Sequence, residues 1–197
     1  MEFVKNYLET LKKEIETLDM KDIVNVVDVL FNAWKNGKQV FIFGNGGSAS
    51  TASHFACDLG KGTLQRVYDQ NEKRFRVMSL TDNVAIMTAF ANDLSYEDIF
   101  VQQLSNLVNP GDVVIGLTGS GNSPNVVKAM DFAKKNRATT IAFLGFEGGK
   151  VKDIVDHYIL FKSSHYGRLE DSHLILEHLI TSYLKEKINK FYNKKKN

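Results

Sequence analysis

Phe41-Ile42-Phe43-Gly44-Asn45-Gly46-Gly47-Ser48 joins an apolar run typical of a buried strand to glycines at the point where a helix is expected to start. A second unit of this kind runs over residues 113–124 and contains Thr118-Gly119-Ser120-Gly121-Asn122-Ser123. Glycine lets the backbone approach a ligand closely, and the start of a helix offers unpaired N–H groups and the positive end of its dipole. We name residues 44–48 the first glycine turn and residues 118–123 the second glycine turn. Together they predict a phosphorylated ligand.

The sequence around these turns alternates between helix-like and strand-like segments. Apolar residues at three- and four-residue steps predict two helices within residues 2–36, with Asp19 as the cap of the second. Strands are expected over residues 38–43, 75–80, 113–117, 139–144 and 158–161. Further helices are expected over residues 48–59, 84–91, 96–107, 123–136 and 170–190, with a short one after Gly148-Gly149. Such alternation predicts an α/β fold, a parallel sheet with helices on both faces.

The polar segments of interest are expected on one rim of this sheet. Ligands of open parallel sheets bind beyond the carboxyl ends of the strands. Both glycine turns, Thr81-Asp82-Asn83 and the segment before Glu170 follow such ends. The length fits one domain, residues 1–197, in which residues 2–36 are expected to pack on the core or between subunits.

The composition is that of an ordinary soluble protein, with 43% hydrophobic and 24% charged residues. The net charge of +2 does not indicate nucleic-acid binding, and the basic residues 185–197 are interpreted as a solvated end. The one cysteine, Cys57, excludes an intrachain disulfide framework and is expected to be a small buried side chain in a reducing compartment. No segment resembles a signal peptide or reaches membrane-spanning length, so we expect a cytoplasmic protein without a membrane partner.

The glycine turns also exclude some ligands. The first turn lacks the Gly-x-Gly-x-x-Gly spacing of dinucleotide-binding folds and the Gly-Lys-Ser/Thr of nucleotide P-loops. Nucleoside triphosphate chemistry is therefore not expected. The hydroxyls of Thr118, Ser120 and Ser123 surround two glycines at a helix start, which suits a phosphate monoester bound by neutral donors.

Further motifs follow the same order over most of the chain. They are Gly44-Asn45-Gly46-Gly47-Ser48, His54-Phe55-Ala56, Ala91-Asn92-Asp93, Ile99-Phe100, Ser120-Gly121-Asn122-Ser123-Pro124-Asn125-Val126, His173 and His178. In this arrangement the chain resembles the sugar isomerase (SIS) domain family and, within it, the phosphoheptose isomerases. The resemblance implies a flavodoxin-like three-layer α/β/α sandwich with a five-stranded parallel sheet. It also implies a homotetramer with active sites at subunit interfaces.

The resemblance assigns substrate contacts to the two turns. It implies that the hydroxyls of Thr118, Ser120 and Ser123 hold the phosphate, assisted by Asn45 and Ser48. The wider set of substrate-binding residues that it implies is Asn45, Gly46, Gly47, Ser48, Asn92, Asp93, Thr118, Gly119, Ser120, Ser123 and Glu170. For Asp93, a helix cap is an equally good interpretation.

Two helices carry candidate acid-base and metal-binding residues. His54 and Asp58 are four residues apart and share one helix face, which without context reads as a surface ion pair. The expected last helix carries the titratable residues Glu170, Asp171, His173, Glu177 and His178. Helical spacing alone groups Glu170, His173 and Glu177 on one stripe. The resemblance instead implies a zinc site made of His54, Asp58, Glu170 and His178.

This implied metal set raises a geometric question. Residues 170 and 178 lie about 12 Å apart along a continuous helix, at 1.5 Å per residue. One metal cannot easily reach both side chains. Our hypothesis is that the site is completed across a subunit interface, or that Glu170 precedes the regular helix.

The chain departs from the usual pattern of this family at three positions. Asp58 replaces the usual glutamate, Glu170 the usual glutamine, and Gly62 a basic residue. The carboxylate-rich set suits zinc and would also accept another divalent ion. The departures leave the preferred sugar phosphate open.

The resemblance implies catalysis by Asp58 and His178. Asp58 would remove the carbon-bound proton of sedoheptulose 7-phosphate, and His178 would move protons at the oxygens, through an enediol(ate). The product would be D-glycero-D-manno-heptose 7-phosphate. The resemblance implies its use in heptose-containing surface glycans, lipopolysaccharide or capsule. The alternatives are a non-catalytic or regulatory sugar-phosphate-binding SIS protein and an isomerase of another ketose phosphate. Binding-only relatives have replaced the acid-base positions, so the retention of both residues favours an enzyme.

Overall fold

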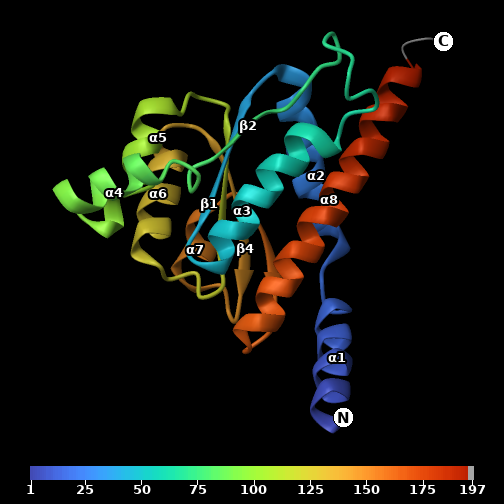
Figure 1. The fold of residues 1–197 in the computed structure, drawn as a ribbon, viewed down its shortest axis with the longest axis vertical. Coiled ribbons are helices and arrows are strands. Elements are labelled where there is room, and N and C mark those ends of the chain that lie inside the picture. The colour runs from blue at the N-terminus through green and yellow to red at the C-terminus, as the bar shows by residue number, and fades with distance from the viewer. Residues whose placement is uncertain (195–197) are drawn as a thin grey trace.

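The computed structural model of the chain describes residues 1–194, and a five-stranded sheet lies at its centre (Figure 1). All neighbouring strands are parallel, and their order is β2-β1-β3-β4-β5. The strands are β1 (Gln39–Gly44), β2 (Arg76–Ser79), β3 (Val113–Thr118), β4 (Thr139–Gly145) and β5 (His157–Phe161). This order is that of flavodoxin-like sheets. The predicted fold class is confirmed.

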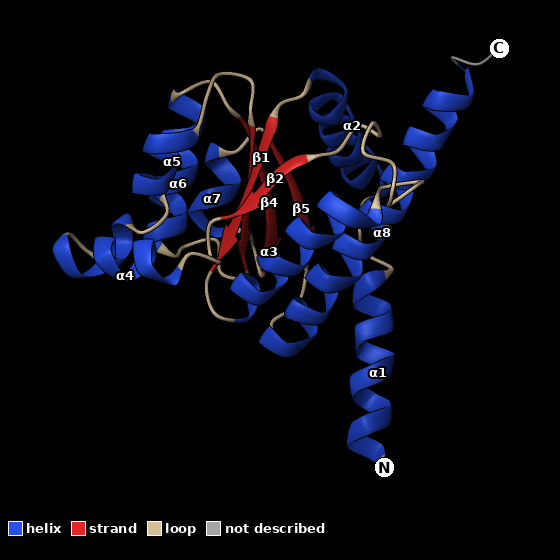
Figure 2. Cartoon of the chain, turned by 45° about the horizontal axis from the view of Figure 1, so that its top comes forward, coloured by secondary structure: helices blue, strands red, loops and turns tan. Residues whose placement is uncertain are grey.

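Helices cover both faces of the sheet, so the molecule has three layers (Figures 1 and 2). One layer consists of α2 (Met20–Asn36), α3 (Gly47–Cys57) and α8 (Tyr166–Lys194). The opposite layer consists of α4 (Val84–Asp93), α5 (Val101–Leu107), α6 (Pro124–Lys135) and α7 (Gly149–Ile154). A hydrophobic core lies on each face of the sheet. In β1, Val40 and Ile42 belong to the core under α2, α3 and α8, whereas Phe41 and Phe43 belong to the core under the opposite layer. Burial on both faces explains the continuous apolar run that precedes the first glycine turn.

The strand register places the two glycine turns side by side. β1 pairs with β3 from Val40↔Val113 to Gly44↔Leu117, so both strands end at the same level. Between them the strand order reverses, because β1 has β2 on one side and β3 on the other. Such a reversal leaves a crevice at the carboxyl ends of the strands, where ligands of these folds bind. The rim predicted from the sequence is therefore formed by this pair of strands.

The two N-terminal helices behave differently. Asp19 accepts a hydrogen bond from the Lys21 N–H at 2.8 Å and caps α2, as predicted, and α2 packs on the sheet. By contrast, α1 (Glu2–Ile15) buries none of its residues and extends away from the body (Figures 1 and 2). Its contact with the start of α8 includes the Arg168 guanidinium, which donates to both Glu14 carboxylate oxygens at 2.8 and 3.1 Å.

The last helix starts earlier than predicted. α8 begins at Tyr166, four residues before the expected start at residue 170. The His165 Nδ1 accepts a hydrogen bond from the Arg168 N–H at 3.3 Å and so caps the first turn, a role for which sequence rules favour Ser, Thr, Asp or Asn. Glu170 therefore lies inside the regular helix, and the hypothesis that it precedes the helix is wrong.

Two smaller expectations also differ from the structure. Residues 96–107 are not one helix but a 3₁₀ turn, Tyr96–Asp98, followed by α5; Ser95 caps the turn by accepting from the Glu97 N–H at 3.2 Å. Cys57 lies at the end of α3 but is exposed rather than buried.

The predicted solvated basic end falls partly on residues 195–197, which lie outside the described residues. Within residues 1–194, the structure contains no helix with both the length and the apolar character that a membrane span needs.

Candidate functional site

A pocket lies on the rim between the ends of β1 and β3. We name it the rim pocket. It is lined by Asn45, Ser48, Leu117, Thr118, Gly119, Ser120, Ser123, Tyr166, Leu169 and Glu170. Both glycine turns contribute, and α8 closes the side with its first turns. None of these lining residues is basic, so an anion in the pocket would rely on hydroxyls, backbone N–H groups and the N-termini of α3 and α6.

The second glycine turn is held in one shape by its own contacts. The Thr118 hydroxyl is buried and accepts a hydrogen bond from the Gly121 N–H at 3.2 Å. Gly121 has a φ of +63°, and a Cβ at this position would lie 1.8 Å from the Gly148 carbonyl oxygen. Ser123 is the N-cap residue of α6 but does not use its hydroxyl as a cap. That hydroxyl remains available to a ligand.

A pair of asparagines connects the two turns. The Asn45 and Asn125 side chains exchange two amide hydrogen bonds, each 2.9 Å long. Asn125 is buried at the start of α6, and the Tyr96 hydroxyl also donates to Asn45 Oδ1 at 3.0 Å. The position of the first turn relative to the second is therefore set by side-chain contacts. The sequence analysis quoted Asn125 within a motif but gave it no role.

Glu170 faces the rim pocket from α8. Its carboxylate lies against Gly47, where a Cβ would be 2.4 Å from Glu170 Oε2, so a larger residue at the start of α3 would displace this carboxylate. A carboxylate at a helix N-terminus is favoured by the helix dipole. Glu170 thus lies in the predicted substrate pocket, whereas the other three predicted metal ligands, His54, Asp58 and His178, meet elsewhere on α3 and α8.

Four other side chains converge beside the two helices α3 and α8. We name His54, Asp58, Glu177 and His178 the histidine–carboxylate cluster; each offers one ligand atom, and these atoms lie within 4.8 Å of one another. Glu177 Oε1 is 3.4 Å from both His54 Nδ1 and His178 Nε2. Asp58 Oδ2 is 3.9 Å from His54 Nε2 and 3.8 Å from His178 Nε2.

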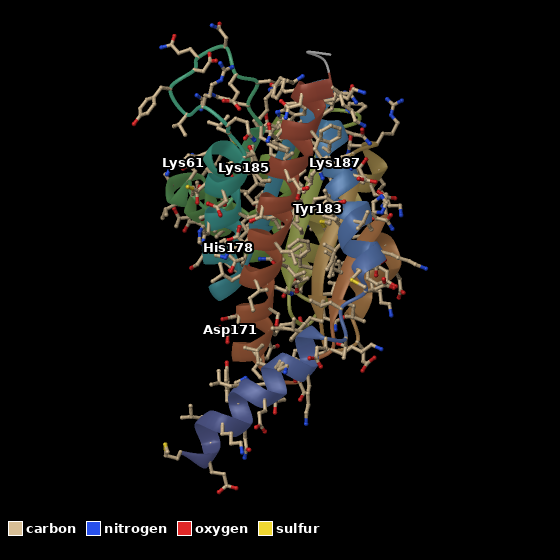
Figure 3. All side chains as sticks on the ribbon, turned by 90° about the vertical axis from the view of Figure 1, so that its right-hand side faces the viewer. Lys61, Asp171, His178, Tyr183, Lys185 and Lys187 are labelled. Atoms are coloured by element: carbon tan, nitrogen blue, oxygen red, sulfur yellow. The ribbon has the colours of Figure 1, made fainter. Side chains whose placement is uncertain are left out.

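The backbone explains how these groups meet. α3 passes into a π-helical turn, η1 (Asp58–Gly62), so Asp58 lies where the helix changes its winding, a feature common at functional sites. His54 precedes it by one turn on the same face. Glu177 and His178 are consecutive in α8, which packs beside α3, and Figure 3 labels His178 on this helix. Such a cluster of histidines and carboxylates has the donor types that bind a divalent metal ion.

The four members differ in their contact with solvent. The His54, Asp58 and His178 side chains are 44%, 27% and 50% exposed, whereas Glu177 is completely buried. Within the described residues, neither Glu177 carboxylate oxygen has a hydrogen-bond partner. Burial, followed by the charge of Asp58, raises the pKa of Glu177 to about 8. One turn away, burial lowers the pKa of His173 to about 4, so this histidine is a neutral core residue beside Phe143.

The rim pocket and the histidine–carboxylate cluster are connected by the same two helices. α3 runs from Ser48 in the pocket to His54 in the cluster, about 9 Å at 1.5 Å per residue. α8 runs from Glu170 to His178 in the same sense, since both helices begin at the carboxyl rim. A ligand with its phosphate in the pocket can therefore present a distant part of its carbon chain to the cluster.

The predicted residues divide into those that the structure brings together and those that it does not. His54, Asp58 and His178 meet within one chain, and the predicted residues of both glycine turns lie around the rim pocket. Asn92 and Asp93 are exposed at the end of α4, where the Asn92 amide donates to Asp93 Oδ1 at 2.9 Å, and they do not line the pocket. Glu177, Tyr166 and Tyr96 were not assigned roles from the sequence. The unusual position of Glu177, acidic within an apolar stretch of α8, was the available signal.

Comparison with known proteins gives a consistent result. The family model described as SIS domain matches residues 2–145. The probable phosphoheptose isomerase of Thermoplasma acidophilum is 34% identical over 183 residues, which cover 93% of this chain and 98% of the relative. The phosphoheptose isomerase of Aquifex aeolicus is 37% identical over 169 residues, 85% of either chain. The structure of phosphoheptose isomerase GmhA from Neisseria gonorrhoeae superimposes with a TM-score of 0.82 at 26% identity, covering 94% of this chain and 97% of that one.

Proposed function

The chain belongs to the SIS domain family and, within it, to the phosphoheptose isomerases, and on this premise we propose that it interconverts sedoheptulose 7-phosphate and D-glycero-D-manno-heptose 7-phosphate. The observation that carries the proposal is the arrangement of two subsites. A hydroxyl-lined pocket lies at two helix N-termini, and an acid-base cluster lies about 9 Å along the same helices. A heptose 7-phosphate has its phosphate and its reacting carbons at opposite ends of the chain.

The rim pocket binds and orients the substrate in this proposal. Thr118, Ser120 and Ser123 donate hydroxyls to the phosphate, and Asn45, Ser48 and the backbone of Gly46, Gly47 and Gly119 complete the contact. The phosphate charge is balanced by helix dipoles instead of a basic side chain. The Glu170 carboxylate is negatively charged and would repel an anionic group. We therefore assign it to the sugar hydroxyls, from which it accepts hydrogen bonds.

The isomerisation moves one proton between neighbouring carbons. The Asp58 carboxylate removes a proton from C1 of the ketose, and His178 donates a proton to the C2 oxygen, which gives an enediol. The proton then returns to C2 from Asp58, while the O1 hydroxyl loses its proton to His178, which leaves the aldose. Since Asp58 Oδ2 faces both histidines, Oδ1 is the oxygen available to the carbon-bound proton.

We propose a divalent metal ion as the cofactor, with zinc as the preferred candidate. His54, Asp58 and His178 have the donor atoms for it, and beside them lies the buried Glu177 carboxylate, which accepts no hydrogen bond within the described residues. When bound, the ion polarises the substrate carbonyl and stabilises the negative charge that develops on its oxygen.

We also propose a homotetramer with the active sites near subunit interfaces. Large apolar side chains are exposed on three helices. They are Phe3, Val4 and Leu8 on α1, Val84 on α4, and Ile175, Leu179 and Tyr183 on α8. Exposed apolar patches often mark protein interfaces. Light scattering coupled to gel filtration measures the assembly directly, and a monomer at micromolar concentration would contradict it.

One assay tests the function. The purified protein is incubated with sedoheptulose 7-phosphate, with and without a chelator, and the aldose is quantified. We expect turnover that falls by about 10²–10⁴-fold in Asp58→Asn and in His178→Ala. Asp153→Asn, an exposed carboxylate on α7, is the matched control. Full turnover by both site variants would refute the assigned roles, and an inactive parent would favour another ketose phosphate or a binding-only protein.

A further inference from the structure

The helix α1 buries none of its residues, yet its side chains make specific contacts with the start of α8. The Tyr7 hydroxyl donates to Asp171 Oδ2 at 2.7 Å, and the Arg168 guanidinium donates to both Glu14 carboxylate oxygens. The guanidinium also lies over the Tyr7 ring, 5.7 Å from its centroid, and the His165 ring packs edge-on against the same ring. We name these five side chains the α1–α8 contact. Figure 3 labels Asp171 on the part of α8 nearest α1.

The α1–α8 contact fixes α8 at two points along α1. Tyr7 and Glu14 are seven residues apart, which places them on the same face of α1 two turns from each other. The Arg168 and Glu14 side chains are each only 15% exposed, so solvent screens their ion pair less than it screens a pair in open water. Two parallel bonds between one guanidinium and one carboxylate also fix the relative orientation of the two groups.

The same turns of α8 carry residues of the rim pocket. Tyr166, Leu169 and Glu170 line this pocket. They alternate in the sequence with the three α8 residues of the α1–α8 contact, which follow one another at three-residue steps and so share one helix face. One side of these turns therefore meets α1, and another side meets the pocket.

The polar groups that α8 presents to the pocket have no partners of their own. Within residues 1–194, neither the Tyr166 hydroxyl nor the Glu170 carboxylate has a hydrogen-bond partner, and both residues are exposed. Only Leu169 is fixed by packing, against Gly119 and Gly145, where a Cβ would collide with its side chain. The positions of the two polar groups therefore depend on the backbone of the first turns of α8, which the α1–α8 contact holds from outside.

We propose that Tyr7 and Arg168 are positioning residues of the isomerase, which hold the first turns of α8 so that Tyr166 and Glu170 face the substrate in the rim pocket. Neither Tyr7 nor Arg168 lines the pocket. The inference rests on the proposed function for the identity of the ligand. His178 lies eight residues beyond Glu170, about 12 Å along the helix axis, so the α1–α8 contact acts on substrate affinity and not on the chemical step.

The test uses two variants of α1 that leave α8 itself unchanged. Tyr7→Phe keeps the ring and removes the hydroxyl, and Glu14→Gln removes the charge that Arg168 contacts. Tyr68→Phe, at a tyrosine that is 98% exposed, and Glu9→Gln, on α1 but outside the contact, are the matched controls. Steady-state kinetics with sedoheptulose 7-phosphate give KM and kcat, and hydrogen exchange reports on the amides of residues 166–170.

We expect each α1 variant to raise KM by about three- to tenfold, the net effect of one hydrogen bond to a charged group, with kcat within about twofold of the parent. Amide exchange at residues 166–170 should become faster, and both controls should match the parent. A parental KM in both variants would overturn the proposal even if exchange became faster, because α1 would then hold α8 without positioning the pocket. A loss of kcat at constant KM would overturn it as well.

Two further measurements separate this inference from the other proposals. Light scattering gives the mass of each variant, and a rise in KM that occurs only where the assembly dissociates would overturn a direct positioning role. Calorimetric titration with sedoheptulose 7-phosphate and with inorganic phosphate gives dissociation constants without turnover. An inactive parent whose affinity for either ligand falls in both α1 variants would contradict the proposed function and support this inference, whereas a parent that binds neither ligand would overturn both.

Discussion

Replacing Glu177 with glutamine should change how the stability of the metal-free protein depends on pH. In the folded protein the pKa of Glu177 is raised from 4.5 to about 8 by burial and by Asp58. Between these values the folded state keeps a proton that the unfolded chain releases. Folding therefore takes up a proton, and the free energy of unfolding falls as the pH rises through this window. Glutamine cannot ionise, so the variant lacks this loss.

The magnitude follows from the size of the shift. Each pKa unit corresponds to about 1.4 kcal/mol, so the parent loses on the order of 5 kcal/mol relative to Glu177→Gln between pH 4.5 and pH 9. This is a large part of the 5–15 kcal/mol that stabilises a typical domain. His173 acts in the other direction, since its pKa is lowered to about 4 and its contribution is lost as the pH falls from 6.5 to 4. It is common to both proteins and cancels in their difference.

The assay is urea unfolding of both proteins in the presence of chelator, at pH values from 5 to 9. The quantity of interest is the difference in free energy of unfolding, variant minus parent, which should rise with pH at up to about 1.4 kcal/mol per unit. Added zinc should reduce this difference at high pH, because an ion at 1,000 times its dissociation constant stabilises the parent by about 4 kcal/mol. A difference that stays flat or declines between pH 5 and 8 would refute the electrostatic reasoning.

Three further predictions concern other parts of the structure. Gly121→Ala forces a Cβ to 1.8 Å from a backbone oxygen, so thermal and urea unfolding should show a loss of about 2–4 kcal/mol, and an unchanged stability would contradict the described turn. Asn125→Ala leaves Asn45 without its amide partner, so steady-state kinetics should show a KM for the sugar phosphate about tenfold higher with a smaller change in kcat; an unaltered KM would exclude a positioning role. Arg168→Ala removes the bidentate bond to Glu14, so α1 should be cleaved faster in limited trypsin digestion, whereas equal cleavage would show that this bond does not hold the helix.

The fold could be predicted from the sequence because its signals are local. The apolar run of β1 and the glycines after it mark a buried strand and a helix start by themselves. Asp19 marks a helix cap in the same way. The start of α8 could not be predicted, because His165 caps it with a ring nitrogen, which a list of preferred capping residues does not contain.

The site was predictable only in part, because it depends on which helix faces meet. His54 and Asp58 share a face by spacing alone, and the resemblance to a family identified His178. Spacing alone placed Glu177 on a stripe with Glu170 and His173. The structure separates these three: Glu170 reaches the rim pocket, His173 enters the core and Glu177 faces α3. That separation depends on the packing of α8 against α3, which no local pattern contains.

The division of the cluster between α3 and α8 has a consequence for how the protein is made. Asp58 and Glu177 are separated by about 120 residues of sequence, so at roughly 5–20 residues per second the ribosome needs on the order of 10 s to add the second pair of donors after the first. Until α8 has emerged and packed, the nascent chain offers only His54 and Asp58. The cluster that we propose as a metal site is therefore complete only after synthesis of α8, and unfinished chains lack two of its four donors.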